Sequence, residues 1–223
     1  MIVDDLRERF GNIDIYLFDQ LLRGRIAPGM RILDAGCGSG RNIVFLLRAG
    51  YDVFAADPDA AAIHAVRRLA QALAPQLPAG NFRHEPIERA TFPEGFADVV
   101  ISSAVLHFAE GDSQFDAMLR GTWRMVKPGG ILFCRLASSI GIESQIDRVD
   151  GRVCLLPDGS HRYLVDERLL MSLTGELGGE LLDPLKTTVV QGQRAMTTWV
   201  VRRTRGVTVR PRTDSHDRSR LDR

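Results

Sequence analysis

One stretch constrains the fold more than any other: a short apolar run that ends in three glycines at alternate positions. Residues 31–35 read Arg-Ile-Leu-Asp-Ala, a pattern that predicts a buried strand. Gly36, Gly38 and Gly40 follow, and the apolar spacing beyond them is typical of a helix packed on a sheet. A strand, a glycine turn and a helix let the backbone approach a ligand closely, with free N–H groups of the helix start facing it.

Two features distinguish this turn from a dinucleotide site. Its spacing is G-x-G-x-G, whereas the dinucleotide fingerprint is G-x-G-x-x-G. Asp34 also ends the strand two positions before the first glycine, where a carboxylate would repel a pyrophosphate but attract the cationic amino acid end of S-adenosylmethionine. Residues 33–40, Leu-Asp-Ala-Gly-Cys-Gly-Ser-Gly, resemble motif I of the class I S-adenosylmethionine-dependent methyltransferases.

The resemblance implies S-adenosylmethionine as the cofactor and an α/β fold. That fold is a doubly wound, mostly parallel seven-stranded sheet, Rossmann-like, with a terminal antiparallel hairpin. The residues after the glycine turn fit it, because apolar strand patterns alternate with helical ones. Strands are predicted at 51–56, 81–84, 97–102 and 131–136, and helices at 60–73 and 114–126. Another helix is predicted at 15–26, after a short helix or lid segment at 6–13.

The alternation breaks after residue 137. A hairpin is predicted at 152–165 around the turn Pro157-Asp-Gly-Ser160, followed by a helix at 166–177 with Asp166 as its cap. Two antiparallel strands, 180–190 and 195–202, come last. We therefore expect one methyltransferase domain over residues 1–203, with an inserted cap hairpin at 138–165. The Arg-rich composition of residues 204–223 predicts a disordered tail.

Composition excludes several classes of protein. Hydrophobic residues make up 44% and charged residues 26% of the chain, as in ordinary soluble domains. No signal-peptide pattern or apolar run of ~18 residues is present, so we expect a cytoplasmic protein without a membrane span. The net charge of +1 comes from the Arg-rich tail, and the acidic body gives no support for nucleic-acid binding. The three isolated cysteines predict neither a disulfide nor a metal site.

Several residues are candidates for holding the cofactor. Asp57, at the end of the second predicted strand and 19 positions after Gly38, is expected to accept hydrogen bonds from the ribose hydroxyls. The alternative for Asp57 is a helix N-cap, with Pro58 at the first helical position. Arg41 would oppose the dipole of the following helix, which indicates an anionic partner or a side chain that extends to solvent. The resemblance implies cofactor contacts at Asp34, Gly36, Cys37, Gly38, Gly40, Arg41, Asp57, Pro58, Ile87 and Ser103. Glu88 is either an acceptor for the adenine amine or an exposed loop carboxylate.

The chemistry at the methyl acceptor is less constrained. His107 follows the fourth predicted strand and is a candidate general base for a hydroxyl acceptor, a cofactor contact, or a histidine that only starts a helix. A thiol, amine or chalcogen anion would need no base. Residues 40–42, 50–53 and 196–200 resemble the small-molecule branch of the family, including methyltransferases of the tellurite-resistance type. The acceptor is therefore expected to be a small molecule, and the protein a monomer or homodimer.

Two other functions are compatible with this sequence: a nicotinamide-dependent oxidoreductase on a similar fold, and a non-catalytic S-adenosylmethionine-binding regulator. The segment 138–165, with the N-terminal segment, is predicted to cap the acceptor pocket, because such insertions emerge where ligands bind. Arg148, Arg152, Arg162 and Tyr163 are its expected polar contacts, suited to an anionic or aromatic acceptor. The alternative is a hairpin that covers a sheet edge or makes a dimer contact.

Overall fold

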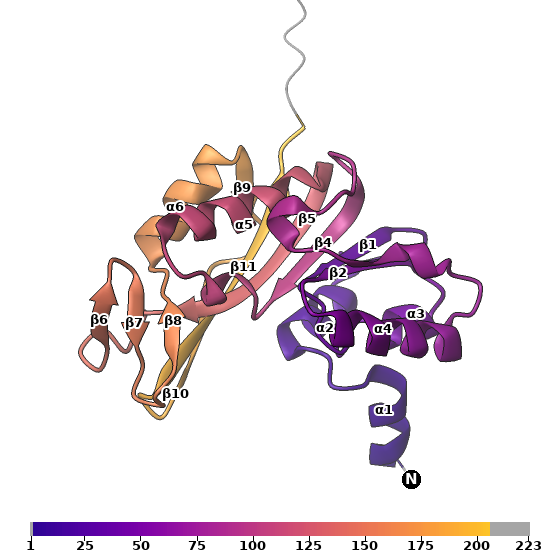
Figure 1. Cartoon of the computed structure of the whole chain (residues 1–223), viewed down its shortest axis with the longest axis horizontal. Coiled ribbons are helices and arrows are strands. Elements are labelled where there is room, and N and C mark those ends of the chain that lie inside the picture. Colours follow the sequence, from indigo (N-terminus) through magenta and orange to yellow (C-terminus); the bar gives the residue numbers. More distant parts are fainter. Residues whose placement is uncertain (1, 206–223) are drawn as a thin grey trace, which may run out of the picture.

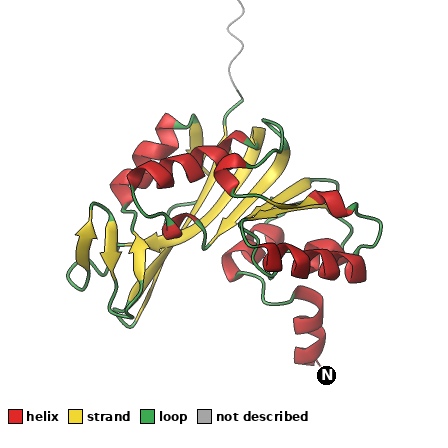
Figure 2. Cartoon of the chain, viewed as in Figure 1, coloured by secondary structure: helices red, strands yellow, loops and turns green. Residues whose placement is uncertain are grey.

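The computed structural model describes residues 2–205, with side chains from residue 5 onward. A mostly parallel sheet runs through the middle of the molecule, with helices on both faces (Figures 1 and 2). The tail predicted at 204–223 lies outside the described residues except for Thr204 and Arg205. Within residues 2–205, no helix combines the length and apolarity that a membrane crossing requires.

The central sheet has the strand order β10-β11-β5-β4-β1-β2-β3. The first five strands in sequence run parallel: β1 (Arg31–Ala35), β2 (Asp52–Asp57), β3 (Phe82–His84), β4 (Ala97–Ser103) and β5 (Val126–Ser138). The hairpin of β10 (Lys186–Val190) and β11 (Arg194–Arg203) adds antiparallel to β5. This arrangement confirms the predicted seven-stranded sheet with its terminal hairpin, and β9 (Gly179–Leu181) pairs with β11 beside this path.

Two strand predictions need correction. The strand expected over 180–190 is two strands, because Asp183-Pro184 lies between β9 and β10 and proline cannot donate to a ladder. The strand expected over 131–136 is longer, because β5 begins at Val126 and includes residues 127–130. The register shift between the Ala97 and Val99 pairs accommodates these extra residues as an irregularity of the ladder.

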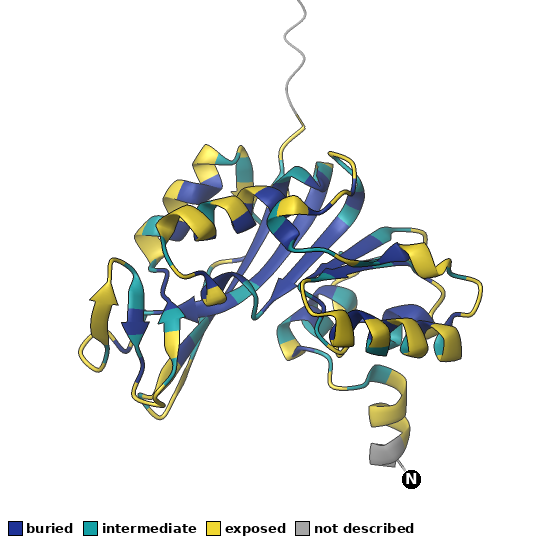
Figure 3. Cartoon of the chain, viewed as in Figure 1, coloured by how far each residue is buried: buried dark blue, intermediate teal, exposed yellow. Residues whose placement is uncertain are grey.

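The helices divide between the two faces of the sheet (Figures 1 and 3). Apolar residues of α2 (Ile15–Leu22), α3 (Val44–Arg48) and α4 (Ala60–Leu73) join one buried cluster. Those of α5 (Asp112–Arg124) and α6 (Glu167–Glu176) join the other. The side chains facing the sheet are buried, whereas the outer faces of α4, α5 and α6 are largely exposed. Helix α1 (Ile2–Phe10) projects from the α3 side.

The helix after the glycines is shorter than expected. It starts at Val44, so Arg41 precedes the helix by three positions and the argument from its dipole does not apply. Residues 41–43 form a turn instead. The N-cap residue, Ile43, makes no side-chain hydrogen bond to the helix start.

The segment after β5 forms a second, small sheet of β6 (Asp147–Asp150), β7 (Val153–Leu155) and β8 (His161–Tyr163). The β7–β8 hairpin was expected and β6 was not. The small sheet lies beside the end of β5 and near β10 (Figure 1). It joins the main sheet where the Val165 N–H donates to the Ala137 carbonyl. Asp166 caps α6 as predicted, accepting from the Leu169 N–H at 2.8 Å.

Candidate active site with two adjoining cavities

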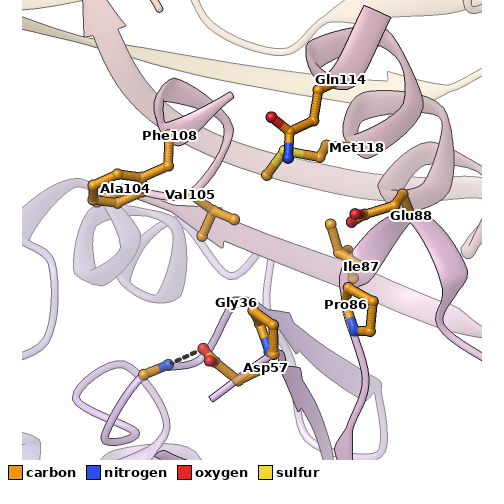
Figure 4. A pocket seen from close by; sticks show the side chains of 12 residues that line it. Gly36, Asp57, Pro86, Ile87, Glu88, Ala104, Val105, Phe108, Gln114 and Met118 are labelled. Atoms are coloured by element: carbon orange, nitrogen blue, oxygen red, sulfur yellow. Dashed lines mark hydrogen bonds between the residues drawn. The ribbon is translucent and has the colours of Figure 1, made fainter. Parts of the chain in front are cut away.

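A cavity of about 480 Å³ opens at the carboxyl ends of β1, β2 and β4 (Figure 4). This volume lies within the usual range for small-molecule sites. Six of its lining residues were among those singled out in the sequence: Gly36, Gly38, Asp57, Pro58, Ile87 and Glu88. The others were missed: Pro86, Ala104, Val105, Phe108, Gln114 and Met118. Figure 4 shows Gln114 and Met118 above the cavity, opposite Asp57 and Gly36.

The three glycines have different roles. A Cβ on Gly36 would stand 2.4 Å from Val105 Cγ2, so Gly36 is required by packing. A Cβ on Gly40 would meet side chains of α4 and Ile43 at 3.1–3.4 Å. Only Gly38 combines a left-handed backbone, φ 51°, with open space in the direction of the missing Cβ. The close approach of a ligand to the backbone is therefore expected at Gly38.

Asp57 holds the glycine turn against the end of β2. Its Oδ2 accepts a hydrogen bond from the Gly38 N–H at 2.8 Å, drawn as a dashed line in Figure 4. Its Oδ1 accepts from the Asp59 N–H at 2.9 Å. The alternative role of Asp57 as a helix N-cap is wrong, because Asp59 caps α4 by accepting from the Ala61 N–H. Each carboxylate oxygen of Asp57 keeps a second lone pair for a ligand hydroxyl.

Asp34 lies behind the turn as a buried carboxylate. It is 1% exposed, and its Oδ2 has no hydrogen-bond partner in the part of the chain that the structure describes. Burial raises its pKa to about 7, with Asp57 adding to the rise and Arg41 opposing it. Such an oxygen is costly unless a cation or donor satisfies it. Asp34 does not line the cavity, but an unsatisfied anion here fits a ligand with an ammonium group.

Cys37 does not reach the cavity with its side chain. The side chain is buried, and burial raises the pKa of its thiol. Its N–H and that of Gly36 both donate to the Ala56 carbonyl, at 3.2 and 2.8 Å. Cys37 therefore joins the turn to β2 through its backbone.

Arg41 and Ser103 meet outside the first cavity. Arg41 Nη2 donates to Ser103 Oγ at 3.1 Å and lies 3.8 Å from Asp14 Oδ2. Asp14 is buried, caps α2, and also pairs with Arg135 on β5 at 3.2 Å. Arg41 and Ser103 thus connect the N-terminal segment to the ends of β4 and β5. Sequence reasoning missed Asp14, although its position just before a predicted helix is a recognised cap signal.

A second cavity, of about 250 Å³, adjoins the first, since Ala104 lines both. Ala104 follows β4 with φ 64°, a left-handed conformation that is unusual for a residue with a Cβ. The second cavity is bounded by β5, the hairpin of β10 and β11, and the β7–β8 turn. Its charged and titratable residues are His107, Arg135, Asp158, Arg162 and Arg194.

His107 lines this second cavity. Its side chain is buried, and Nδ1 accepts a hydrogen bond from the Ala137 N–H at 3.0 Å. Since a backbone N–H can only donate, Nδ1 is unprotonated and Nε2 carries the proton. Burial, with Arg162 and Arg135 nearby, lowers the pKa of His107 to about 4. A neutral imidazole with its lone pair engaged is a hydrogen-bond donor, and this geometry argues against His107 as a general base.

Of the four expected cap contacts, only Arg162 lines the second cavity. Arg152 pairs with Asp166 at 2.9 Å, and Arg148 donates to the Gly151 carbonyl. Tyr163 is buried, and its hydroxyl donates to Asp112 at 2.7 Å. These three side chains stabilise the small sheet and its junction with α5 and α6. Among residues whose placement is described, no group of three or more His, Cys, Asp or Glu could hold a metal ion.

Comparison with known proteins identifies a methyltransferase domain in this chain. Residues 33–134 match a family model described as a methyltransferase domain. A ubiquinone biosynthesis O-methyltransferase of Methylocella silvestris is 34% identical over 117 residues, which are 51% of this chain and 43% of the relative. One of the same name from Brucella ovis is 29% identical over 208 residues, covering 88% of this chain and 70% of the relative. The chain spans about half the length of the first curated relatives it matches.

A solved structure supports the fold over almost the whole chain. It is the 1,6-didemethyltoxoflavin-N1-methyltransferase of Burkholderia thailandensis, solved with 1,6-didemethyltoxoflavin and S-adenosylhomocysteine. It superposes with a TM-score of 0.66 at 18% identity, covering 90% of this chain and 82% of its own. At this identity the match establishes the architecture and leaves the reaction to be argued from the site.

Proposed function

We propose that this chain, which belongs to the class I methyltransferases, binds S-adenosylmethionine in the first cavity and methylates a small molecule. The observation that carries the proposal is the open space over Gly38, flanked by the carboxylate of Asp57. A backbone without a Cβ and an acceptor for hydroxyls are what an adenosine ligand requires at this point of the fold. The two O-methyltransferase relatives and the matched methyltransferase domain support the same activity.

The residues of the cavity fit the parts of this ligand. Asp57 has lone pairs for the ribose hydroxyls, and Ile87 and Pro86 offer apolar surface to the adenine, with Glu88 beside them. Asp34, buried and without a partner among the described residues, complements the ammonium group. Cys37, Gly40 and Ser103 do not line the cavity and act indirectly, by packing and by holding Arg41.

When bound, the cofactor would supply an electrophilic methyl group, carried on a sulfonium whose sulfur keeps the electron pair when the methyl group is transferred. The chain itself contributes alignment and exclusion of water. Val105, Phe108 and Met118 form an apolar wall of the cavity, and good alignment alone supplies up to ~10 kcal/mol. Because His107 has no free lone pair, it takes no proton from the acceptor.

The small sheet, residues 147–163, is proposed to cap the acceptor side of the site. The support for this proposal is that four residues of the segment line the second cavity: Leu156, Asp158, Ser160 and Arg162. We further propose a cytoplasmic location, which is supported by three cysteines that are all buried, unpaired thiols. Fractionation with detection of the native protein tests the location.

Calorimetry tests the cofactor, and a turnover screen tests the enzyme. We expect S-adenosylhomocysteine to bind with micromolar affinity, roughly −8 kcal/mol, and NADH not to bind. Purified protein should then release S-adenosylhomocysteine from S-adenosylmethionine with at least one member of a panel of small phenols, thiols and amines. Tight binding without turnover across the panel would favour a non-catalytic binding protein, and binding of NADH alone would refute the proposal.

A further inference from the structure

We propose that the second cavity receives the methyl acceptor and selects an acceptor that carries a carboxylate group, held by Arg162 and Arg194. This inference rests on the proposed function, because it names the substrate class of the same site. Its support lies in the position of the cavity, the balance of charge on its walls and the hydrogen-bonding state of its histidine.

The position follows from two residues on the boundary between the cavities. Ala104 lines both, at the point where β4 ends and its backbone enters the left-handed region. Phe108 lines the first cavity, and the guanidinium of Arg162, from the second, lies 4.8 Å from its ring centroid. An acceptor in the second cavity is therefore adjacent to a cofactor in the first, as methyl transfer requires.

The charge on the walls is positive. Three arginines face one carboxylate, that of Asp158. Arg135 is neutralised by the buried Asp14 at 3.2 Å, on the side of the N-terminal segment. Within the described residues, Arg162 and Arg194 have no carboxylate oxygen within 4.0 Å. Arg162 is half-buried and Arg194 is exposed. Two cations that line one small cavity can both donate to an anion that accepts several hydrogen bonds.

Asp158 lies close enough to both arginines to offset one of their two positive charges, which leaves the cavity with a net positive charge. Its Oδ1 accepts from the N–H and the hydroxyl of Ser160, at 3.0 and 2.6 Å, which closes the hairpin turn. His107 adds a donor without adding a charge, because its Nδ1 accepts from Ala137 and Nε2 carries the proton. The cavity therefore offers guanidinium and imidazole N–H groups together, which is a donor set for an oxyanion and a poor one for a cationic or purely apolar acceptor.

Binding of matched ligand pairs tests the inference without knowledge of the natural acceptor. Protein saturated with S-adenosylhomocysteine is titrated in a calorimeter with small aromatic and aliphatic carboxylates, beginning with benzoate, and with the primary amide of each. We expect at least one carboxylate to bind about tenfold or more tightly than its amide, with an affinity that weakens as salt is added. Arg162→Gln and Arg194→Gln should each reduce this preference.

Arg202→Gln is the matched control. Arg202 lies on the same strand as Arg194 but about 26 Å further along it, at ~3.3 Å per residue, and pairs with Glu180 on the surface. It should leave carboxylate binding unchanged. Affinity for S-adenosylhomocysteine, measured for every variant, reports whether the first cavity is intact. If one arginine variant fails to fold, the other decides the result.

Four outcomes are informative. A carboxylate preference that both arginine variants lose supports the inference. No preference for any carboxylate over its amide, or a preference that survives both substitutions, overturns it while the proposed function stands, provided S-adenosylhomocysteine still binds. Failure of S-adenosylhomocysteine to bind the unmodified protein, with arginine-dependent carboxylate binding retained, refutes the proposed function but keeps the anion site. Failure of both refutes both.

Discussion

Substituting Gly36 by alanine should destabilise the fold through a specific clash. The residue has φ 81°, and a left-handed backbone costs an L-residue ~1–2 kcal/mol. The new Cβ would stand 2.4 Å from Val105 Cγ2 and 2.7 Å from Cγ1, and overpacking of this kind costs ~1–3 kcal/mol. The expected loss in the free energy of unfolding is therefore ~2–5 kcal/mol.

Gly38→Ala provides the comparison within the same turn. Its φ of 51° brings the same backbone cost of ~1–2 kcal/mol, but a Cβ there meets no atom within 4 Å. The difference in stability between the two variants thus isolates the clash with Val105, and we expect ~1–3 kcal/mol. Gly38→Ala, although the less destabilising variant, should bind S-adenosylhomocysteine at least about tenfold more weakly than the unmodified protein, because its Cβ would enter the space of the ligand.

Denaturant unfolding of the ligand-free proteins measures the stability difference, and calorimetry with S-adenosylhomocysteine measures the affinity. The double variant Gly36→Ala/Val105→Ala removes the methyl groups that collide, so the two substitutions should couple favourably by ~1–3 kcal/mol. Equal destabilisation by Gly36→Ala and Gly38→Ala, with no rescue by Val105→Ala, would refute the reasoning. Undiminished affinity in Gly38→Ala would show that the ligand does not lie over this turn.

Three further predictions concern single side chains. Asp57→Ala should weaken S-adenosylhomocysteine binding by ~1–3 kcal/mol in calorimetry, because the hydrogen bonds to Gly38 and the ribose are lost. Asp59→Ala is the control: it should leave binding unchanged and lower only the free energy of unfolding, by the ~1 kcal/mol of a helix cap. The pKa of Asp34, about 7, lies above its unfolded value of 3.8, so the native state holds an extra proton between these pH values and the free energy of unfolding falls as pH rises through that window. Asp34→Asn should remove this pH dependence and raise the free energy of unfolding of the ligand-free protein at pH 8 by roughly 2–4 kcal/mol. An unchanged denaturation curve at pH 8 would contradict this prediction. The pKa of His107, about 4, lies below its unfolded value of 6.5, so the contribution of His107 to stability is complete above pH 6.5 and should fall by roughly 2–3 kcal/mol as pH drops to 4. His107→Gln should abolish that part of the pH profile of stability. If kcat instead shows an inflection near pH 6.5 that this substitution removes, His107 acts as a base after all.

Local patterns in the sequence were sufficient for most of the fold. The strand at 31–35 and the helix at 60–73 have the predicted bounds, because each combines a clear apolar period with a turn or cap at its ends. The Asp166 cap of α6 was also predicted, since a cap depends on residues three positions apart. The alternation of strands and helices then allowed few arrangements, and the predicted parallel sheet with a terminal hairpin is the one observed.

Contacts between elements that are distant in the sequence could not be predicted from it. Gly121 lies inside α5, although glycine is unfavourable in the interior of a helix. It is required there because a Cβ at this position would stand 2.7 Å from the backbone of Glu88. Met118 and Gln114 on the same helix line the first cavity, yet their spacing is that of an ordinary buried helix face. Such contacts depend on how closely a helix packs against a loop, which no local pattern encodes.

Half of the residues that line the first cavity were singled out from the sequence, whereas the second cavity was not predicted as one site. Gly38 and Asp57 are 19 residues apart and are brought together by one βαβ unit, whose geometry is regular enough to infer from spacing. His107, Arg135, Arg162 and Arg194 come from four separate parts of the chain and meet only after the β10–β11 hairpin and the small sheet have packed against β5. The hydrogen bond from Ala137 that makes His107 a donor is likewise a contact across 30 residues. Residue types and periodicity thus determined the scaffold and half of the lining of the first cavity. The charge and protonation of the second cavity depend on distances between side chains, and only the packed tertiary structure sets those distances.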